Sequence, residues 1–127
     1  MTVNECSGRT LAFLGDAVWS VIVREYLILH GEGKGRTLQK KSIAYVSAKA
    51  QCSFYEKLHE EGFFTEWEEE IFRRGRNSNE GSVPRNTPVA VYRISTGFEA
   101  LIGALHLEGK QDRIGQIWDK VRTIGDA

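Results

Sequence analysis

Two acidic side chains stand alone in apolar stretches of the sequence. Asp16 lies within LAFLGDAV, residues 11–18, and Glu99 lies within STGFEALIGAL, residues 95–105. The apolar residues in both stretches have the spacing that predicts a helix with one buried face. A buried carboxylate is costly unless it is paired with a positive group or bound to a metal. Each of these acids therefore needs a partner elsewhere in the fold.

One candidate partner is a divalent cation held between the two acids. If two packed helices bring Asp16 and Glu99 together, the carboxylates repel each other unless something positive lies between them. Mg²⁺ suits such a site, because it often binds through one or two carboxylates, keeps several waters and takes substrate phosphates as further ligands. This interpretation predicts phosphoryl-transfer chemistry. The alternative is that each acid caps a helix or forms an ion pair, with Arg24 or Arg93 as the partner.

The charges of the chain balance in number but are unevenly distributed. Its 17 Lys and Arg match 17 Asp and Glu, so total charge gives no indication of a nucleic-acid partner. Residues 56–70 contain seven Glu and one Lys, which we interpret as solvated surface. Residues 73–93 contain five Arg and one Glu. This basic block includes GRNSNEGSVPRNTP, residues 75–88, whose Gly, Asn, Ser and Pro predict a loop.

Helices must position these residues, because apolar side chains recur at helical spacing along the whole chain. Thr10 is the expected N-cap of the first helix and Gly31 its stop, and Thr65 forms a capping box with Glu68. The expected helical segments are 11–29, 37–61 with a break near 46–47, 65–75, 87–109 and 112–124. The inner face of the second segment is expected at Leu38, Ile43, Val46, Ala50, Phe54 and Leu58. No segment is a convincing strand, so we predict one all-α domain over residues 1–127.

Composition excludes several classes of protein. Hydrophobic residues make up 41% of the chain and charged residues 27%, which is typical of a folded globular domain. The two cysteines, Cys6 and Cys52, lack the spacing of a zinc site or a disulfide framework, and we expect reduced thiols. No apolar run approaches the length of a membrane span, so we expect no membrane partner.

Five motifs, in order along the chain, resemble segments of the ribonuclease III family. LAFLGDAV and GFEALIGAL resemble its two signature segments. YVSAKAQ (45–51), RRGRN (73–77), VPRNT (83–87) and YRISTGFEALIG (92–103) resemble Mini-ribonuclease III, the short branch that consists of the nuclease domain alone. The resemblance covers about residues 11–122. It implies the helical endonuclease-domain bundle of the family, assembled as a homodimer.

The resemblance also implies an activity and its site. Asp16 and Glu99 are then the catalytic and metal-binding residues, holding Mg²⁺, with Mn²⁺ as a possible substitute. The implied reaction is hydrolysis of double-stranded RNA by metal-activated water, which leaves a 5′-phosphate and a short 3′ overhang. The implied substrate is a ribosomal RNA precursor. The expected location is the cytoplasm, or the organelle stroma if the source is a plant.

The sequence departs from the longer enzymes of the family at two positions. Those enzymes carry an acid four residues before the first signature acid and another three residues before the second. Ala12 and Thr96 occupy these positions here. Because such spacings keep each pair on one helix face, the expected cluster of four acids is reduced to two. The short branch shows the same reduction, and we expect weaker metal binding as a result.

RNA capture is expected to fall to the nuclease domain, because we expect no double-stranded RNA-binding domain after residue 127. The basic loop is the candidate surface, because arginines can contact phosphates while asparagines bond sugar or base edges. The expected RNA-binding residues are Arg73, Arg74, Arg76, Asn77, Arg85 and Asn86.

The sequence leaves two alternatives to an endoribonuclease open. A non-catalytic RNA-binding or ribosome-associated module with the same fold is disfavoured by the presence of both signature acids. An all-α nucleotide pyrophosphatase would also use carboxylates on helices with Mg²⁺. The segment EWEEE, residues 66–70, is better explained as a capping box and a favourable helix dipole.

Overall fold

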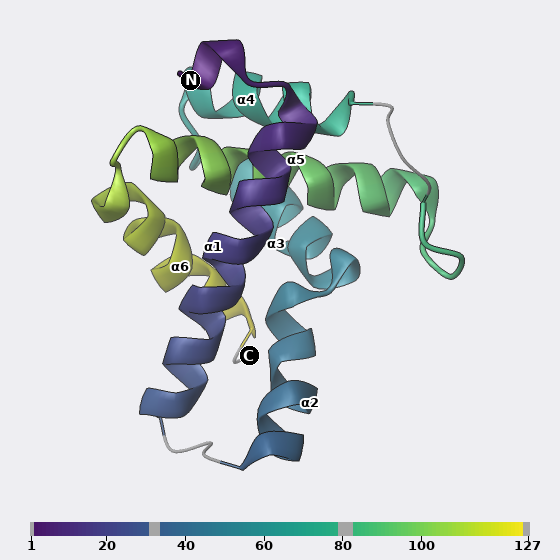
Figure 1. Cartoon of the computed structure of the whole chain (residues 1–127), viewed down its shortest axis with the longest axis vertical. Helices are drawn as coiled ribbons and strands as arrows, with labels where there is room; N and C mark the ends of the chain where they lie inside the picture. The colour runs from purple at the N-terminus through teal and green to yellow at the C-terminus, as the bar shows by residue number, and fades with distance from the viewer. Residues whose placement is uncertain (1, 31–33, 79–82, 126–127) are drawn as a thin grey trace.

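A computed structural model describes residues 2–30, 34–78 and 83–125, and the regular secondary structure in these ranges is entirely helical. A short 3-10 helix at Val3–Glu5 precedes six α-helices (Figure 1). These are α1 (Gly8–Leu29), α2 (Gly35–Val46), α3 (Ala48–Glu60), α4 (Glu66–Arg76), α5 (Val89–Leu107) and α6 (Gln111–Gly125). The predicted all-α class is therefore confirmed. No helix in the described part is long and apolar enough to cross a membrane.

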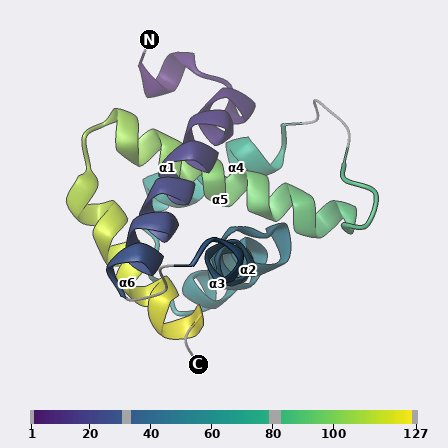
Figure 2. The same cartoon turned by 60° about the horizontal axis from the view of Figure 1, so that its bottom comes forward.

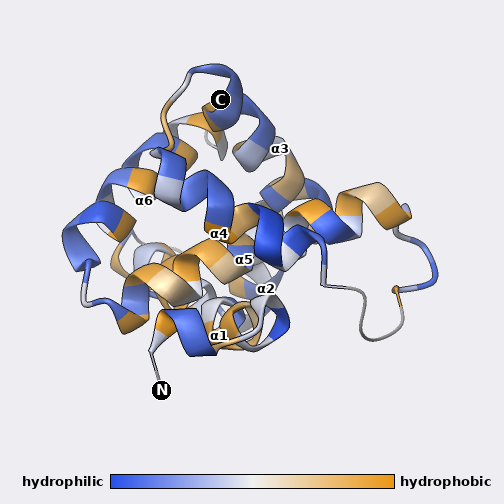
Figure 3. Ribbon diagram, turned by 90° about the horizontal axis from the view of Figure 1, so that it is seen from above, coloured by the Kyte–Doolittle hydropathy of each residue, from blue (hydrophilic) through white to orange (hydrophobic). Residues whose placement is uncertain are grey.

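Helix α5 is the centre of the bundle, and α1 crosses it at a steep angle (Figures 1 and 2). All residues from 100 to 105 are buried. This follows from the almost unbroken apolar run FEALIGAL, which covers more than one helix face with hydrophobic side chains (Figure 3). Helices α1, α3 and α4 pack around α5, so a polar residue on α5 faces one of these neighbours.

Glycines allow the backbones of α1 and α5 to touch where the helices cross. A Cβ atom added at Gly15 would lie 1.7 Å from the carbonyl oxygen of Glu99. A Cβ atom added at Gly103 would lie 2.0 Å from the carbonyl oxygen of Leu11. Any side chain at these two positions would force the helices apart. The crossing therefore fixes the residue after Gly15, which is Asp16, close to Glu99.

The predicted break in the second helical region occurs at Ser47. Its extended backbone, with φ −66° and ψ 154°, ends α2 and starts α3, and its Oγ accepts a hydrogen bond from the Ala50 amide. The expected inner position of Ile43 is wrong, because this side chain is 56% exposed. Tyr45 is buried instead, and its carbonyl accepts a hydrogen bond from the Trp19 indole. Side chains two positions apart in sequence point about 200° apart around a helix. Burial of Tyr45 therefore turns Ile43 outward.

The predicted helix ends lie within two residues of the observed ones, except at the start of α1. Ser7, not Thr10, is the N-cap, and its side chain accepts a hydrogen bond from the amide of Thr10, which lies inside the helix. The predicted stop at Gly31 lies outside the described residues. The capping box of Thr65 and Glu68 is present as expected. Pro88 is the N-cap residue of α5.

The acidic block is not uniformly solvated, which corrects the expectation from sequence. Glu68 is only 2% exposed, and its carboxylate accepts two hydrogen bonds of 2.8 Å from Arg113 on α6. Glu69 accepts a hydrogen bond from Tyr55 and contacts His59. Arg113 neutralises Glu68 and Tyr55 donates to Glu69 from other helices, and local sequence does not reveal such partners. Cys6 and Cys52 are free thiols, as predicted, and both are buried.

Candidate active site

Asp16 on α1 and Glu99 on α5 line one cleft of about 280 Å³. Asp16 is exposed at its surface, whereas Glu99 is largely buried. Their proximity follows from the glycine contacts at the crossing, which leave no room for a layer of side chains between the two helices. The sequence therefore identified two acids that the fold does bring together.

Burial raises the pKa of Glu99 to about 9, and the hydrogen bond and negative charge of Asp16 contribute to this rise. A hydrogen bond from Gln51 acts in the opposite direction. Glu99 is thus protonated at neutral pH when no cation is bound. Across the described part of the chain, no ion pair joins either acid to Arg24 or Arg93. The two acids are partners of each other, and the alternative of arginine pairing is wrong.

Ala12 and Thr96 line the same cleft as the two acids. The positions at which the longer enzymes carry further carboxylates therefore face this site. Thr96 donates its hydroxyl to the Tyr92 carbonyl at 3.0 Å, so this hydroxyl is engaged with its own helix. The described residues contain no group of three or more His, Cys, Asp or Glu that could hold a metal ion. The donor set is two hard oxygen ligands beside open space, which suits a hydrated Mg²⁺.

Other cleft residues were not identified from the sequence as substrate contacts. Arg9, Phe13, Ser78, Tyr92 and Arg93 also line the cleft. A signal was present in the helical spacing, since residues 9, 12, 13 and 16 share one face of α1. Residues 92, 96 and 99 similarly share one face of α5. These neighbours give the acidic pair a rim that carries positive charge.

Of the six predicted RNA-binding residues, four are exposed and two are half-buried. Arg73, Asn77, Arg85 and Asn86 are exposed, at the end of α4 and in the segment before α5. Arg76 is half-buried, donates to Asn77 Oδ1 at 3.2 Å and lies over the Phe72 ring. Residues 79–82 of the same loop lie outside the described residues.

Arg74 differs from the other five. Its guanidinium donates to the carbonyl of Val3 at 3.1 Å and to that of Cys6 at 3.5 Å. The side chain is half-buried and tethers the N-terminal segment to α4. These bonds occupy a side chain for which the sequence predicted an RNA contact, and they were invisible in sequence because the partners are about seventy residues away.

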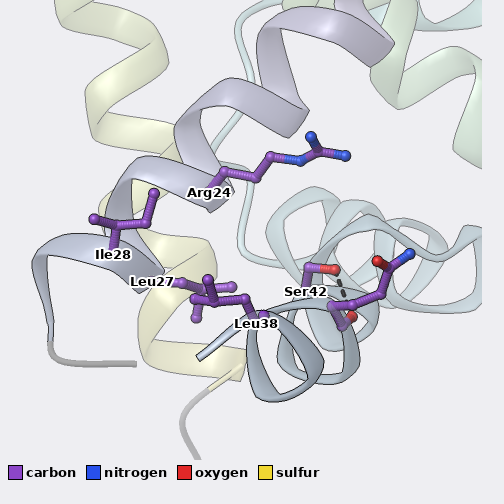
Figure 4. Close-up of a pocket in the computed structure, with 7 residues that line it drawn as sticks. Arg24, Leu27, Ile28, Leu38 and Ser42 are labelled. Carbon is purple, nitrogen blue, oxygen red and sulfur yellow. Dashed lines mark hydrogen bonds between the residues drawn. The ribbon is translucent and has the colours of Figure 1, made fainter. Parts of the chain in front are cut away.

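A second pocket, of about 220 Å³, lies between α1 and α2 (Figure 4). Leu27, Ile28 and Leu38 form its apolar wall, with Arg24 and Ser42 beside them. It contains no carboxylate, so it lacks ligands for a metal–nucleotide complex. The cleft between α1 and α5 is therefore the better candidate for chemistry.

Comparison with known proteins shows to which family the chain belongs. The family model described as "Ribonuclease III domain" matches residues 9–110. The chain is 46% identical to Mini-ribonuclease 3 of Streptococcus pneumoniae over 112 residues, which are 88% of each chain. It is 46% identical to Mini-ribonuclease 3 of Brevibacillus brevis over 121 residues, 95% of this chain and 89% of the relative.

A solved structure supports the same assignment. The crystal structure of a protein from Fusobacterium nucleatum superposes with a TM-score of 0.81 at 38% identity, covering 91% of this chain and 92% of that one. The match includes both helices that carry the acidic pair, since the family model spans Asp16 and Glu99. The chain belongs to the ribonuclease III family and is an endoribonuclease.

Proposed function

We propose that Asp16 and Glu99 hold a divalent cation, Mg²⁺ or in its place Mn²⁺, and that the site hydrolyses phosphodiester bonds of double-stranded RNA. The observation that carries this proposal is the pairing of the two acids in one cleft. Glu99 keeps its proton near neutral pH only because burial and Asp16 disfavour its ionised form. A divalent cation held by both carboxylates would offset both effects, because its charge would favour the ionised form of Glu99.

The residues of the chain have separate tasks in this mechanism. When bound, the cation would supply Lewis acidity and activate water for attack on phosphorus. Glu99 must release its proton to become a ligand, and exposed Asp16 offers its carboxylate from the opposite helix. Arg93 and Arg9 on the rim of the cleft attract the phosphate backbone. In the net reaction water attacks phosphorus and loses a proton to solvent, the bond to the 3′ oxygen breaks and that oxygen takes up a proton, so the products carry a 5′-phosphate and a 3′-hydroxyl.

The proposed RNA surface continues from the cleft to the basic loop. Arg73, Arg76, Asn77, Arg85 and Asn86 are the residues that we assign to backbone and sugar contacts, with Arg74 held by the N-terminal segment. Duplex RNA is recognised mainly by shape, phosphates and 2′-hydroxyls, so modest sequence preference is expected.

The proposed assembly is a homodimer whose two clefts each cut one strand. Phe13 supports this, because it lies at the cleft, is 84% exposed and offers an apolar contact to a second copy. We propose a ribosomal RNA precursor as the substrate and the cytoplasm as the location. The support for both is the similarity to bacterial Mini-ribonuclease 3 proteins.

One assay tests the proposal against its rivals. The protein is incubated with long duplex RNA, single-stranded RNA or nucleoside triphosphates, in Mg²⁺ or in chelator. We expect cleavage of duplex RNA only, and only with Mg²⁺. Duplex binding without cleavage would instead favour the non-catalytic module, and triphosphate hydrolysis would favour the pyrophosphatase.

Substitution of the acids tests the site itself. Asp16→Asn and Glu99→Gln should each abolish cleavage in a folded protein, because each removes one of two ligands. Glu108→Gln, at the exposed C-cap of α5, is the matched control and should remain active. Substantial Mg²⁺-dependent cleavage by either acid variant would remove that residue from the site.

A further inference from the structure

Gln51 is a buried polar residue whose side chain reaches a different helix. Among the described residues, three polar or charged residues are buried: Gln51 at 1% exposure, Glu68 at 2% and Ser95 at 4%. Glu68 is bound by an arginine, and Ser95 donates to a carbonyl of its own helix. Gln51 Nε2 instead donates from α3 to Glu99 Oε2 on α5, at 3.4 Å. The amide therefore joins the protein core to the acidic pair.

The start of α3 fixes where this amide lies. Ser47 caps the helix, and the backbone nitrogen of Gln51 donates to the Ser47 carbonyl at 3.0 Å, which closes the first turn. Phe54 and Leu58 follow at positions i+3 and i+7 and are buried on the same face, which packs into the core. Gln51 is not among the residues that line the cleft. It contacts Glu99 from the side of the core.

An amide has the right chemistry for this position. A carboxylate oxygen accepts hydrogen bonds, so the NH₂ group of the amide faces Glu99. A lysine or arginine here would neutralise Glu99 and compete with a cation, whereas an acidic residue would add a third negative charge. An aliphatic residue would remove the donor that Gln51 offers to Glu99 Oε2. Glutamine orients the carboxylate and leaves its charge unchanged.

We infer that Gln51 is a positioning residue that holds the Glu99 carboxylate in the orientation required to bind the cation. This inference rests on the metal site proposed above. Residues that hydrogen-bond a metal ligand from outside the coordination sphere typically change metal affinity by about 10- to 100-fold when they are replaced. Gln51 has that relation to Glu99. It acts through Glu99 and contacts neither RNA nor the reacting phosphate.

Two substitutions test the inference in the full-length protein. Gln51→Met keeps the length of the side chain and removes the donor. Gln51→Asn keeps the amide but shortens the side chain by one carbon, about 1.5 Å, which takes the donor out of reach. Cys52→Ala, at the next buried position of α3, is the matched control for altered packing. Folding of each variant is checked by urea unfolding in chelator.

Three readouts separate positioning from packing. Mn²⁺ binding without RNA, followed by electron paramagnetic resonance, should weaken about tenfold in both Gln51 variants and stay unchanged in Cys52→Ala. In cleavage assays the Mg²⁺ concentration for half-maximal rate should rise similarly, while KM for RNA at saturating Mg²⁺ stays the same. In metal-free wild type, the NMR signals of the Gln51 side-chain amide should shift when Glu99 is replaced by Gln.

The outcomes distinguish this inference from the proposed function. Wild-type Mn²⁺ affinity in a folded Gln51→Met or Gln51→Asn protein would overturn the positioning role. Gln51→Asn decides the matter if Gln51→Met does not fold, because it retains a polar group at the site. If Mn²⁺ binding in wild type is itself unaffected by Asp16→Asn, the metal site is wrong, and the inference is overturned together with it.

Discussion

Replacing Glu99 by Gln should remove a specific pH dependence from the stability of the metal-free protein. The pKa of Glu99 is about 9 in the folded protein, against an ordinary value of 4.5. Between these values the folded chain keeps a proton that the unfolded chain has released. The contribution of Glu99 to stability is therefore complete below pH 4.5 and is lost progressively as the pH rises toward 9.

The size of the effect follows from the number of protons. One proton difference lowers the free energy of unfolding by about 1.4 kcal/mol per pH unit. The amide introduced by Glu99→Gln does not titrate, so the stability of this variant relative to wild type should rise by about 2.7 kcal/mol between pH 5 and pH 7. Comparison with wild type at each pH cancels the titration of groups that do not interact with Glu99.

Urea unfolding followed by tryptophan fluorescence at pH 5, 6, 7 and 8, in chelator, measures this difference. Glu108→Gln, at an exposed position, should follow wild type at every pH. Mg²⁺ should then stabilise wild type but not Glu99→Gln, because it binds only the folded form with an ionised Glu99. A stability difference between wild type and Glu99→Gln that does not change with pH would show that Glu99 is already ionised in the folded protein, and would refute the assigned pairing with Asp16.

Three further predictions concern other parts of the molecule. Arg113→Met should lower the free energy of unfolding by about 3 to 5 kcal/mol in a chemical denaturation experiment, because it leaves buried Glu68 without its partner; a loss below about 1 kcal/mol would mean that Glu68 is well solvated. Thr96→Asp adds a carboxylate to the cleft and should lower the Mg²⁺ concentration for half-maximal cleavage; an unmoved Mg²⁺ titration would place residue 96 away from the cation. Arg85→Ala should flatten the slope of log affinity for duplex RNA against log salt concentration by about 1 to 2 in a dimer. Arg74→Ala should chiefly lower the free energy of unfolding, because it removes the bond to the N-terminal segment. A salt slope changed by Arg74→Ala and not by Arg85→Ala would reverse their assigned roles.

Sequence patterns predicted the features that depend on residues close together in the chain. The five helical segments, the break at Ser47 and the capping box at Thr65 follow from local spacing and capping chemistry, and the structure contains them. Asp16 and Glu99 were identifiable because lone acids in apolar helices need a partner. Ser7 was missed because Thr10, three residues later, is also a favourable capping residue by type.

Contacts between distant segments were beyond sequence patterns. Arg74 was assigned to RNA because it stands in a basic block, although its guanidinium binds carbonyls at the N-terminus. Glu68 was assigned to solvent because it stands in an acidic block, although Arg113 on the last helix donates hydrogen bonds to its carboxylate. Gln51 carried no signal, since a single glutamine in an amphipathic helix is ordinarily an exposed residue. In each case the deciding partner belongs to another part of the chain.

The glycine contacts between α1 and α5 also limit how this enzyme can diversify. Even a methyl group at Gly15 or Gly103 would overlap a backbone carbonyl, so no single substitution there adjusts the separation of the acids by a small amount. Substitution at either glycine therefore disrupts the arrangement of the two acids altogether, and no intermediate arrangement is accessible. Exposed positions such as Arg85 and Asn86 have no such restriction and can change one residue at a time. Directed evolution toward a new RNA target should therefore randomise the loop and leave the helix crossing intact, so that preference changes while the cut stays the same.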